Sequence, residues 1–301
     1  MIVGIAVETT VDSNEASAVT RRSANVTARR RRGSNRGGAA VIGGQRSSHP
    51  ALEGAARPWA TSASYDSGRV TTGGADEQRV PDGEVLAELY RRRFPPEELE
   101  AMRGVWRVLV RDFFGPRIPV DATVVDVGAG PCLFINEVKA ARRIAVDANP
   151  TLAEAAGPGV EAVVDADLDL PSIPDGTADT VFMSNFLEHL ASPAEVLRVL
   201  RAARRILRPG GEILVLQPNF RLCPGRYFDF VDHSVIVTDR GLVEGLEAAG
   251  FEVRELRVRF LPFTSKSRLP KWPWAVSLYL RLRPVQWLLA GQSFVRARVR
   301  S

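Results

Sequence analysis

The feature that most constrains the fold is an apolar run ending in a glycine turn, residues 124–130 (VVDVGAG). Such a run is typical of a buried parallel strand that leads into a helix. The two glycines permit a tight turn and bring backbone N–H groups close to a ligand. A second apolar stretch ends in Asp147, 17 residues after Gly130, where a carboxylate can bind both hydroxyls of an adenosine ribose. The sequence therefore predicts a nucleoside cofactor at the carboxyl edge of an open α/β sheet.

Strand and helix patterns alternate along the chain after residue 120. The predicted strands are 123–127, 144–147, 160–164, 180–184, 212–216, 251–260 and 293–299, and the predicted longer helices are 131–141, 193–207 and 239–249. In the last strand, Val295, Ala297 and Val299 alternate with Phe294 and two arginines, which favours a half-exposed antiparallel strand. A mainly parallel sheet with one antiparallel C-terminal strand is a doubly wound α/β fold.

Charge separates the start of the chain from the rest. Residues 1–60 hold nine arginines and four acids, a balance of +5, which equals the net charge of the whole chain. We expect residues 1–80 to be a disordered basic leader and 81–301 to be the folded domain. Within it, 81–119 would form two cap helices, 120–260 and 292–301 the core, and 261–291 a helical insertion. The neutral balance after residue 60 argues against a specific nucleic-acid surface.

The glycine turn by itself leaves more than one cofactor open. A dinucleotide fingerprint requires Gly or Ala at position 133, where this chain has Leu133. A triphosphate loop requires Gly-Lys-Ser/Thr, which the sequence lacks. An NAD-linked oxidoreductase would also require a proton donor such as Tyr-x-x-x-Lys, and none is present. This oxidoreductase is the enzymatic alternative, and a non-catalytic nucleoside-binding module is the other.

Several motifs in order resemble the class I S-adenosylmethionine-dependent methyltransferases, in particular bacterial members of methyltransferase type 11. They are DVGAG at 126–130, Asp147, DAD at 165–167, DTVFMS at 179–184, LRPGG at 207–211 and GF at 250–251. The resemblance implies a Rossmann-like seven-stranded sheet, S-adenosylmethionine as cofactor and methyl transfer as activity. One departure is Cys132, where many members of the family have a third glycine.

The resemblance also assigns cofactor-binding residues. It implies that Gly128 and Gly130 lie against the methionine part of the cofactor and that Asp126 shapes the loop. Asp147 would bind the ribose hydroxyls. The adenine amino group would be bound by Asp165, with Asp167 as the alternative. The cofactor carries no phosphates, so the loop needs no lysine or arginine.

Two histidines are the candidates for acceptor chemistry, because a base is needed when the methyl acceptor arrives protonated. His189 follows the fourth strand at the active edge, although it could only pack against or cap the next helix. His233 lies after the fifth strand in YFDFVDH, next to Asp232. Asn185 and Asn219 end strands four and five and are predicted on the substrate side. Glu188 is interpreted as a helix-start charge.

The remaining expectations concern partners and location. With two cysteines and no zinc-type spacing, no metal is predicted, and a reduced, cytoplasmic setting is favoured. The acceptor is expected to be a small molecule or a glycan- or lipid-linked compound. Residues 271–291 are rich in Trp and Leu and include Arg281 and Arg283. We interpret them as a packed helix pair, or as a peripheral membrane or dimer contact.

Overall fold

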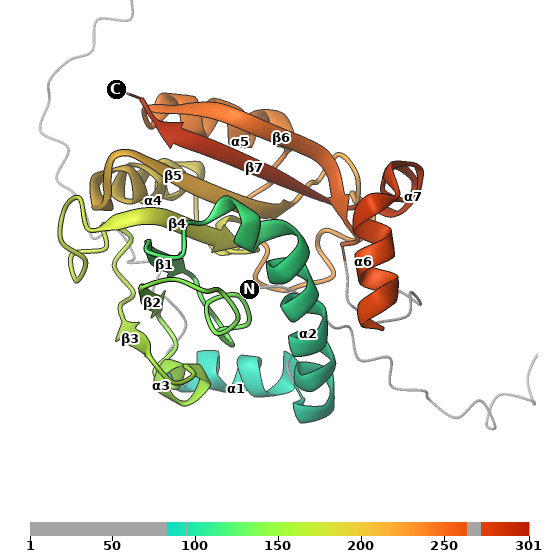
Figure 1. Ribbon diagram of the computed structural model, residues 1–301, viewed down its shortest axis with the longest axis horizontal. Helices are drawn as coiled ribbons and strands as arrows, with labels where there is room; N and C mark the ends of the chain where they lie inside the picture. The colour runs from blue at the N-terminus through green and yellow to red at the C-terminus, as the bar shows by residue number, and fades with distance from the viewer. Residues whose placement is uncertain (1–82, 94, 264–271, 301) are drawn as a thin grey trace, which may run out of the picture. The chain divides into compact units, whose positions relative to one another are not determined.

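The computed structural model describes residues 83–93, 95–263 and 272–300. Its centre is a seven-stranded sheet in the order β3-β2-β1-β4-β5-β7-β6 (Figure 1). The strands are β1 (Thr123–Val127), β2 (Arg142–Asp147), β3 (Val160–Val164), β4 (Ala178–Ser184), β5 (Leu207–Pro218), β6 (Phe251–Leu261) and β7 (Gln292–Val299). The predicted strands are thus all present, and β5 begins five residues earlier than expected.

Strand direction matches the prediction of one antiparallel C-terminal strand. The pairs β1–β2, β1–β4, β2–β3 and β4–β5 are parallel, whereas β7 is antiparallel to both β5 and β6. The expectation that β7 is half-exposed was wrong, because it lies between β5 and β6 and its Phe294, Val295 and Ala297 are fully buried. The alternation arises instead near the strand end, where Arg296 pairs with Glu212 across the sheet at 2.8 Å.

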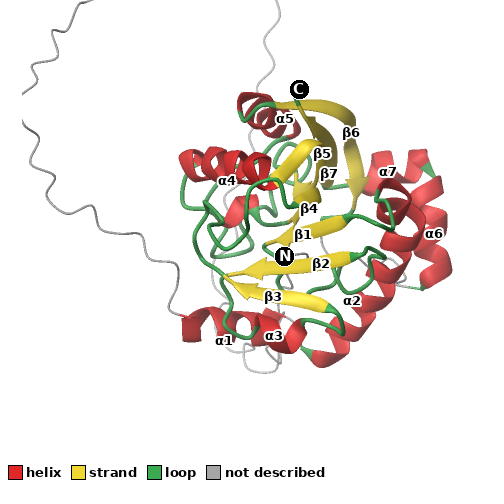
Figure 2. Ribbon diagram, turned by 60° about the vertical axis from the view of Figure 1, so that its left-hand side comes forward, coloured by secondary structure: helices red, strands yellow, loops and turns green. Residues whose placement is uncertain are grey.

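Helices cover both faces of the sheet (Figure 2). The described helices are α1 (Gly83–Arg93), α2 (Pro96–Leu109), α3 (Leu152–Ala155), α4 (Pro193–Ile206), α5 (Asp239–Ala248), α6 (Pro273–Arg281) and α7 (Arg283–Leu289). One face packs against α2 and α6 through an aromatic cluster that includes Trp106, Phe114 and Phe182. The other face packs against α4 and α5 through residues such as Val199 and Leu246. Alternate residues of the central strands therefore enter two separate cores.

Capping residues fix where α4 and α5 begin. Ser192 accepts a hydrogen bond from the backbone N–H of Glu195 at the start of α4, at 3.3 Å. Thr238 does the same for Gly241 at the start of α5, at 3.0 Å. A side-chain acceptor at the cap satisfies a backbone donor that has no partner inside the helix. Each cap follows the loop after a strand, so the loops at the carboxyl edge are anchored at their far ends.

The helix predicted for 131–141 is absent, and the chain makes successive turns from 130 to 137 instead. Cys132 has a φ of +56°, in the left-handed region that interrupts an α-helix. Leu133, Phe134 and Ile135 are still buried, so the apolar pattern was correct although the backbone form was not. The second of the two predicted cap helices also changes form, because α2 ends at Leu109 and continues as a wider π turn, η1 (Val110–Phe114).

The predicted helical insertion contains α6 and α7, and α6 packs against α2. Residues 264–271 of that insertion lie outside the described residues, as does the predicted leader 1–80. The domain boundaries proposed from the sequence therefore remain predictions. Among the described helices, none combines the length and the apolar character needed to cross a membrane.

Candidate functional site

The glycine turn after β1 adopts the backbone conformation expected of its residues. Gly128 and Gly130 have φ values of +69° and +53°, which only glycine adopts without strain. The N–H of Gly128 donates to the carbonyl of Val146 at 2.9 Å, which joins the turn to the end of β2. Cys132 takes a left-handed conformation where many family members have glycine, so this position demands that conformation even without a glycine.

Asp147 ties the turns after β1 and β2 together. Its Oδ2 accepts the N–H of Gly130 at 2.8 Å, and its Oδ1 accepts the N–H of Asn149 at 2.9 Å. The residue is 6% exposed. A carboxylate held by two backbone donors has a fixed orientation. The predicted ribose-binding residue is therefore a fixed acceptor beside the glycine turn.

Asp126 lies under the same turn and is 3% exposed. Burial, together with the nearby charge of Asp147, raises the pKa of Asp126 to about 7. It lines a narrow recess of about 10 Å³, open to solvent, together with Trp106, Gly128 and Ser184. The recess lies between α2 and the glycine turn, so an N-terminal cap helix does contribute to the predicted cofactor region.

The two candidate adenine-binding acids have different surroundings. Asp165 follows β3, and its N–H donates to the carbonyl of Asp147 at 3.0 Å. Its side chain accepts the hydroxyl of Ser172 at 2.7 Å. Asp167 instead pairs with Arg198 of α4 at 2.7 Å. Asp165 is thus the acid adjoining Asp147, the predicted ribose-binding residue, whereas Asp167 is directed toward a neighbouring helix.

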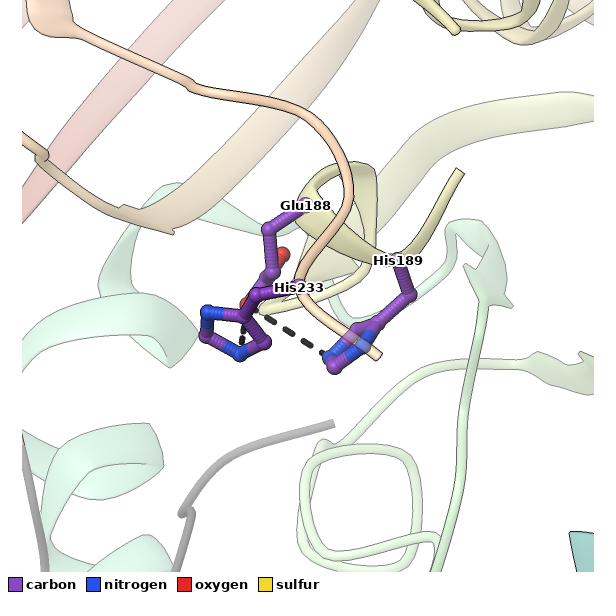
Figure 3. Close-up of side chains that lie close together, drawn as sticks. All are labelled: Glu188, His189 and His233. Atoms are coloured by element: carbon purple, nitrogen blue, oxygen red, sulfur yellow. Dashed lines mark ion pairs between the residues drawn. The ribbon is translucent and has the colours of Figure 1, made fainter. Parts of the chain in front are cut away.

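The loops after β4 and β5 bring the two candidate histidines together. The rings of His189 and His233 are 4.8 Å apart, centre to centre. Glu188 lies between them, with its Oε1 3.7 Å from His189 Nε2 and 3.9 Å from His233 Nε2 (Figure 3). On its other side, His189 Nδ1 is 3.1 Å from a carboxylate oxygen of Asp232. We call Glu188, His189, Asp232 and His233 the histidine cluster.

The histidine cluster corrects the interpretation of Glu188. A helix-start charge would be exposed to solvent, but Glu188 lies in the short 3-10 turn η3 (Leu187–His189) and is 1% exposed. Its Oε2 accepts the side-chain amide of Gln217 at 2.5 Å. The helix cap is supplied by Ser192, so His189 is not the cap of α4 either. The buried Glu188 is a member of the site that the sequence interpretation left out.

Arg93 at the end of α1 is a second member that the sequence did not reveal. Its guanidinium pairs with Asp232 at 2.5 Å, across 139 residues of sequence. Burial would raise the pKa of Asp232, but hydrogen bonds from His189 and Arg93 hold it well below its ordinary value. Burial lowers the pKa of His233, opposed by the charge of Glu188. At neutral pH the cluster therefore contains an ionised Asp232 beside His189.

The two predicted asparagines lie at the edge but differ in their contacts. Asn185 is buried with a φ of +45°, and its amide donates to the hydroxyl of Ser184 at 3.2 Å. Asn219 donates to Asp239 at 2.8 Å and to Ser293 at 3.0 Å. These bonds connect the loop after β5 to α5 and β7. The structure therefore places Asn219 in a buried network rather than in the histidine cluster.

Phe186 links the glycine turn to the histidine cluster. A Cβ built on Gly128 would lie 2.5 Å from the ring of Phe186, so the ring rests directly against the turn. His189 follows only three residues later, and the backbone carbonyl of Glu188 accepts the N–H of Ser234 at 2.8 Å. The cofactor-type turn and the cluster therefore adjoin at one edge of the sheet.

This strand order, with a glycine turn after the first strand and a carboxylate ending the second, defines a Rossmann-like fold that binds a nucleoside cofactor. Residues 125–215 match the family model described as a methyltransferase domain. This match and the fold support a class I S-adenosylmethionine-dependent methyltransferase domain with S-adenosylmethionine as its cofactor.

Solved structures resemble the chain at low sequence identity. A Thermotoga maritima protein described as a SAM-dependent methyltransferase, possible histamine N-methyltransferase, is 17% identical with a TM-score of 0.50, over 71% of this chain and 99% of that one. A SAM-dependent methyltransferase from Archaeoglobus fulgidus is 19% identical with a TM-score of 0.48, over 72% and 100%. No curated protein sequence matches the chain. At these identities the likeness concerns the fold.

Proposed function

We propose that the protein transfers the methyl group of S-adenosylmethionine to a small-molecule or glycan- or lipid-linked acceptor. The observation that carries the proposal is the contact of Phe186 with Gly128, which sets the histidine cluster beside the cofactor turn. Methyl transfer needs an acceptor atom in line with the methyl–sulfur bond and a dry pocket, more than it needs a protein nucleophile. Two adjoining half-sites with buried walls meet that requirement.

On the cofactor side, Gly128 and Gly130 would lie against the methionine part and Asp147 would bind the ribose hydroxyls. The fixed orientation of Asp147 supports this role. We assign the adenine amino group to Asp165, because it adjoins Asp147 and Asp167 is paired with Arg198.

On the acceptor side, His189 and His233 would control the proton of the acceptor. The contact of His189 Nδ1 with Asp232 supports this role, because it orients the ring and leaves Nε2 as the atom with the lone pair. Asn185, which adjoins Ser184 beside the recess, would line the path between cofactor and acceptor.

The exposed surface of α6 and α7 supports a lipid-linked acceptor or a contact with a second copy. Trp274 and Leu278 are 62% and 47% exposed on α6, and Trp287 and Leu288 are 67% and 72% exposed on α7. The two helices contain no acidic residue. Exposed tryptophans with nearby arginines are typical of a peripheral membrane contact. A cytoplasmic location would place this surface at the inner face of a membrane.

The test is calorimetric titration of the full chain with S-adenosylhomocysteine and, separately, with NAD. We expect saturable binding of the first alone, and a loss of affinity of at least 100-fold in Asp147→Ala. Asp175→Ala is the control, because it also removes an aspartate, but one that pairs with Arg205 of α4 and not with the glycine turn. Binding of NAD instead would establish the oxidoreductase alternative. Cofactor binding with no methyl transfer, and no effect of His189→Ala or His233→Ala in cells, would establish a binding module.

A further inference from the structure

We propose that Glu188, His189 and His233 bind a divalent transition-metal cation. Their potential ligand atoms, one carboxylate oxygen and two imidazole nitrogens, all lie within 4.8 Å of one another. In Figure 3 both rings are directed toward the carboxylate of Glu188. The site is new with respect to the sequence prediction, which contained no metal.

The distances fit a shared cation better than direct hydrogen bonds. Glu188 Oε1 is 3.7 Å from His189 Nε2 and 3.9 Å from His233 Nε2, and both separations exceed a hydrogen bond. Ligands bound to one cation at about 2.0 to 2.2 Å are themselves about 3 to 3.5 Å apart. The three side chains therefore need to close by less than about 1.5 Å, which small side-chain rotations can supply.

Supporting residues already hold two of the three ligands in the required orientation. The carboxylate of Asp232 lies 3.1 Å from His189 Nδ1, so that nitrogen carries the proton and Nε2 keeps its lone pair. Gln217 holds Oε2 of Glu188 and leaves Oε1 directed to the histidines. A carboxylate behind a ligating histidine is the usual arrangement around protein metal sites, where it fixes the ring.

Charge and ligand type favour the same cation class. The carboxylate of Glu188 is buried, and a buried charge is costly unless an opposite charge compensates it. Arg93 pairs with Asp232 of the same cluster. Two imidazoles and one carboxylate suit Zn²⁺, Fe²⁺, Mn²⁺ or Co²⁺, whereas Mg²⁺ and Ca²⁺ prefer oxygen ligands.

Three protein ligands leave coordination positions open for an acceptor oxygen and water. The side chain of His189 is 12% exposed, which makes it the entry side of the site. With the cation bound, the two histidines would control the acceptor proton through the metal: a hydroxyl bound to the cation would lose its proton to water more readily, in place of direct transfer to His189. The lone pair of the hydroxyl oxygen would then form the C–O bond, while the electron pair of the broken C–S bond stays on sulfur. This role rests on the proposed methyl transfer, but binding of the cation does not.

The experiment titrates the full chain with Zn²⁺ by calorimetry and with Co²⁺ by visible absorption, after removal of bound metal with a chelator. We expect one equivalent to bind, with an affinity loss of at least 10-fold in Glu188→Gln, His189→Ala and His233→Ala. Asp232→Asn should weaken binding less than loss of a ligand does. His49→Ala, the third histidine of the chain, is the matched control and should bind as the parent does.

Glu188→Gln preserves the size of the side chain, and its thermal unfolding checks that the fold survives. Binding of no cation, binding of several weak equivalents, or one site that is indifferent to all three ligand variants would each refute the proposal. S-adenosylhomocysteine titrated into the same samples separates the two proposals. Loss of cation binding with cofactor binding intact concerns this site alone, and the reverse result concerns the proposed function alone.

Discussion

The two halves of the site are built in different ways. In the glycine-turn half, Gly128, Gly130 and Asp147 lie within 20 residues, and backbone N–H groups satisfy the polar side chain. In the histidine cluster, the members come from Glu188 to His233, with Arg93 much earlier in the chain, and side chains satisfy one another. The first half is a property of a local segment, whereas the second exists only when distant loops meet.

This difference has a consequence for specificity. The cofactor half needs tight turns and one fixed carboxylate, which any sequence with the right glycines and aspartate can provide. The histidine cluster depends on how the loops after β4 and β5 pack, as when the carbonyl of Glu188 accepts the N–H groups of Ser234 and Val235. Under the proposed function, a change of acceptor would involve these loops, while the cofactor half would remain the same.

The largest effect is expected for Gly128→Ala. The new Cβ would lie 2.5 Å from the ring of Phe186, and the φ of +69° is strained for any L-residue. We expect the free energy of unfolding to fall by about 4 kcal/mol, at the upper end of single substitutions. Gly176→Ala has a similar φ of +61° but no neighbour within 4 Å, and should cost only about 1 to 2 kcal/mol. If urea unfolding shows that the two variants lose the same free energy of unfolding, then the contact with Phe186 does not join the halves.

Substitutions in the histidine cluster should separate turnover from cofactor binding. We expect His189→Ala to lower kcat for methyl transfer by a factor of about 10² to 10³, since the side chain that controls the proton of the methyl acceptor would be missing. The affinity for S-adenosylhomocysteine should change less than about 3-fold. Glu255→Gln is the control, because its ion pair with Arg117 belongs to η2 (Gly115–Arg117) and β6. A loss of cofactor affinity in His189→Ala as large as its loss of kcat would mean that the halves are not separate.

The raised pKa of Asp126, in the cofactor half, leads us to expect that the free energy of unfolding depends on pH. Its pKa is about 7 in the fold and near 4 in the unfolded chain, so between these values the native state binds more protons. Stability from this group is therefore present below pH 4 and lost as pH rises through 7, by roughly 4 kcal/mol in all and roughly 3 kcal/mol between pH 5 and pH 8, at about 1.4 kcal/mol per pKa unit. Asp126→Asn should remove that part of the slope. Urea unfolding at pH 5 and pH 8 measures it, and an unchanged slope in the variant would disprove the burial cause.

The smallest effect distinguishes the two candidate adenine-binding acids. We expect Asp165→Ala to weaken S-adenosylhomocysteine binding by about 10-fold, since it would remove one hydrogen bond to the ligand. Asp167→Ala should change the affinity less than about 3-fold, because its partner is Arg198. The calorimetric affinities of the two variants decide the assignment. A larger loss for Asp167→Ala would reverse it.

The sequence predicted the strands well because each is a short apolar run bounded by turn residues, and β1 matches to the residue. It failed at 131–141, where the apolar spacing is helical but the left-handed Cys132 interrupts the helix. It also failed for Glu188, because a glutamate four residues after a strand gives no local sign that it will be 1% exposed. Burial of a charge depends on what packs over it.

By itself the sequence determined the class of fold and the glycine turn, because strand periodicity and turn conformation are local properties of the chain; the cofactor carboxylates stay a prediction. Only the tertiary structure decided that β7 is buried between two strands and that Glu188 lies between His189 and His233. It also decided that Arg93 pairs with Asp232. These contacts join residues far apart in the chain, and their energy comes from burial and charge pairing that no local pattern records.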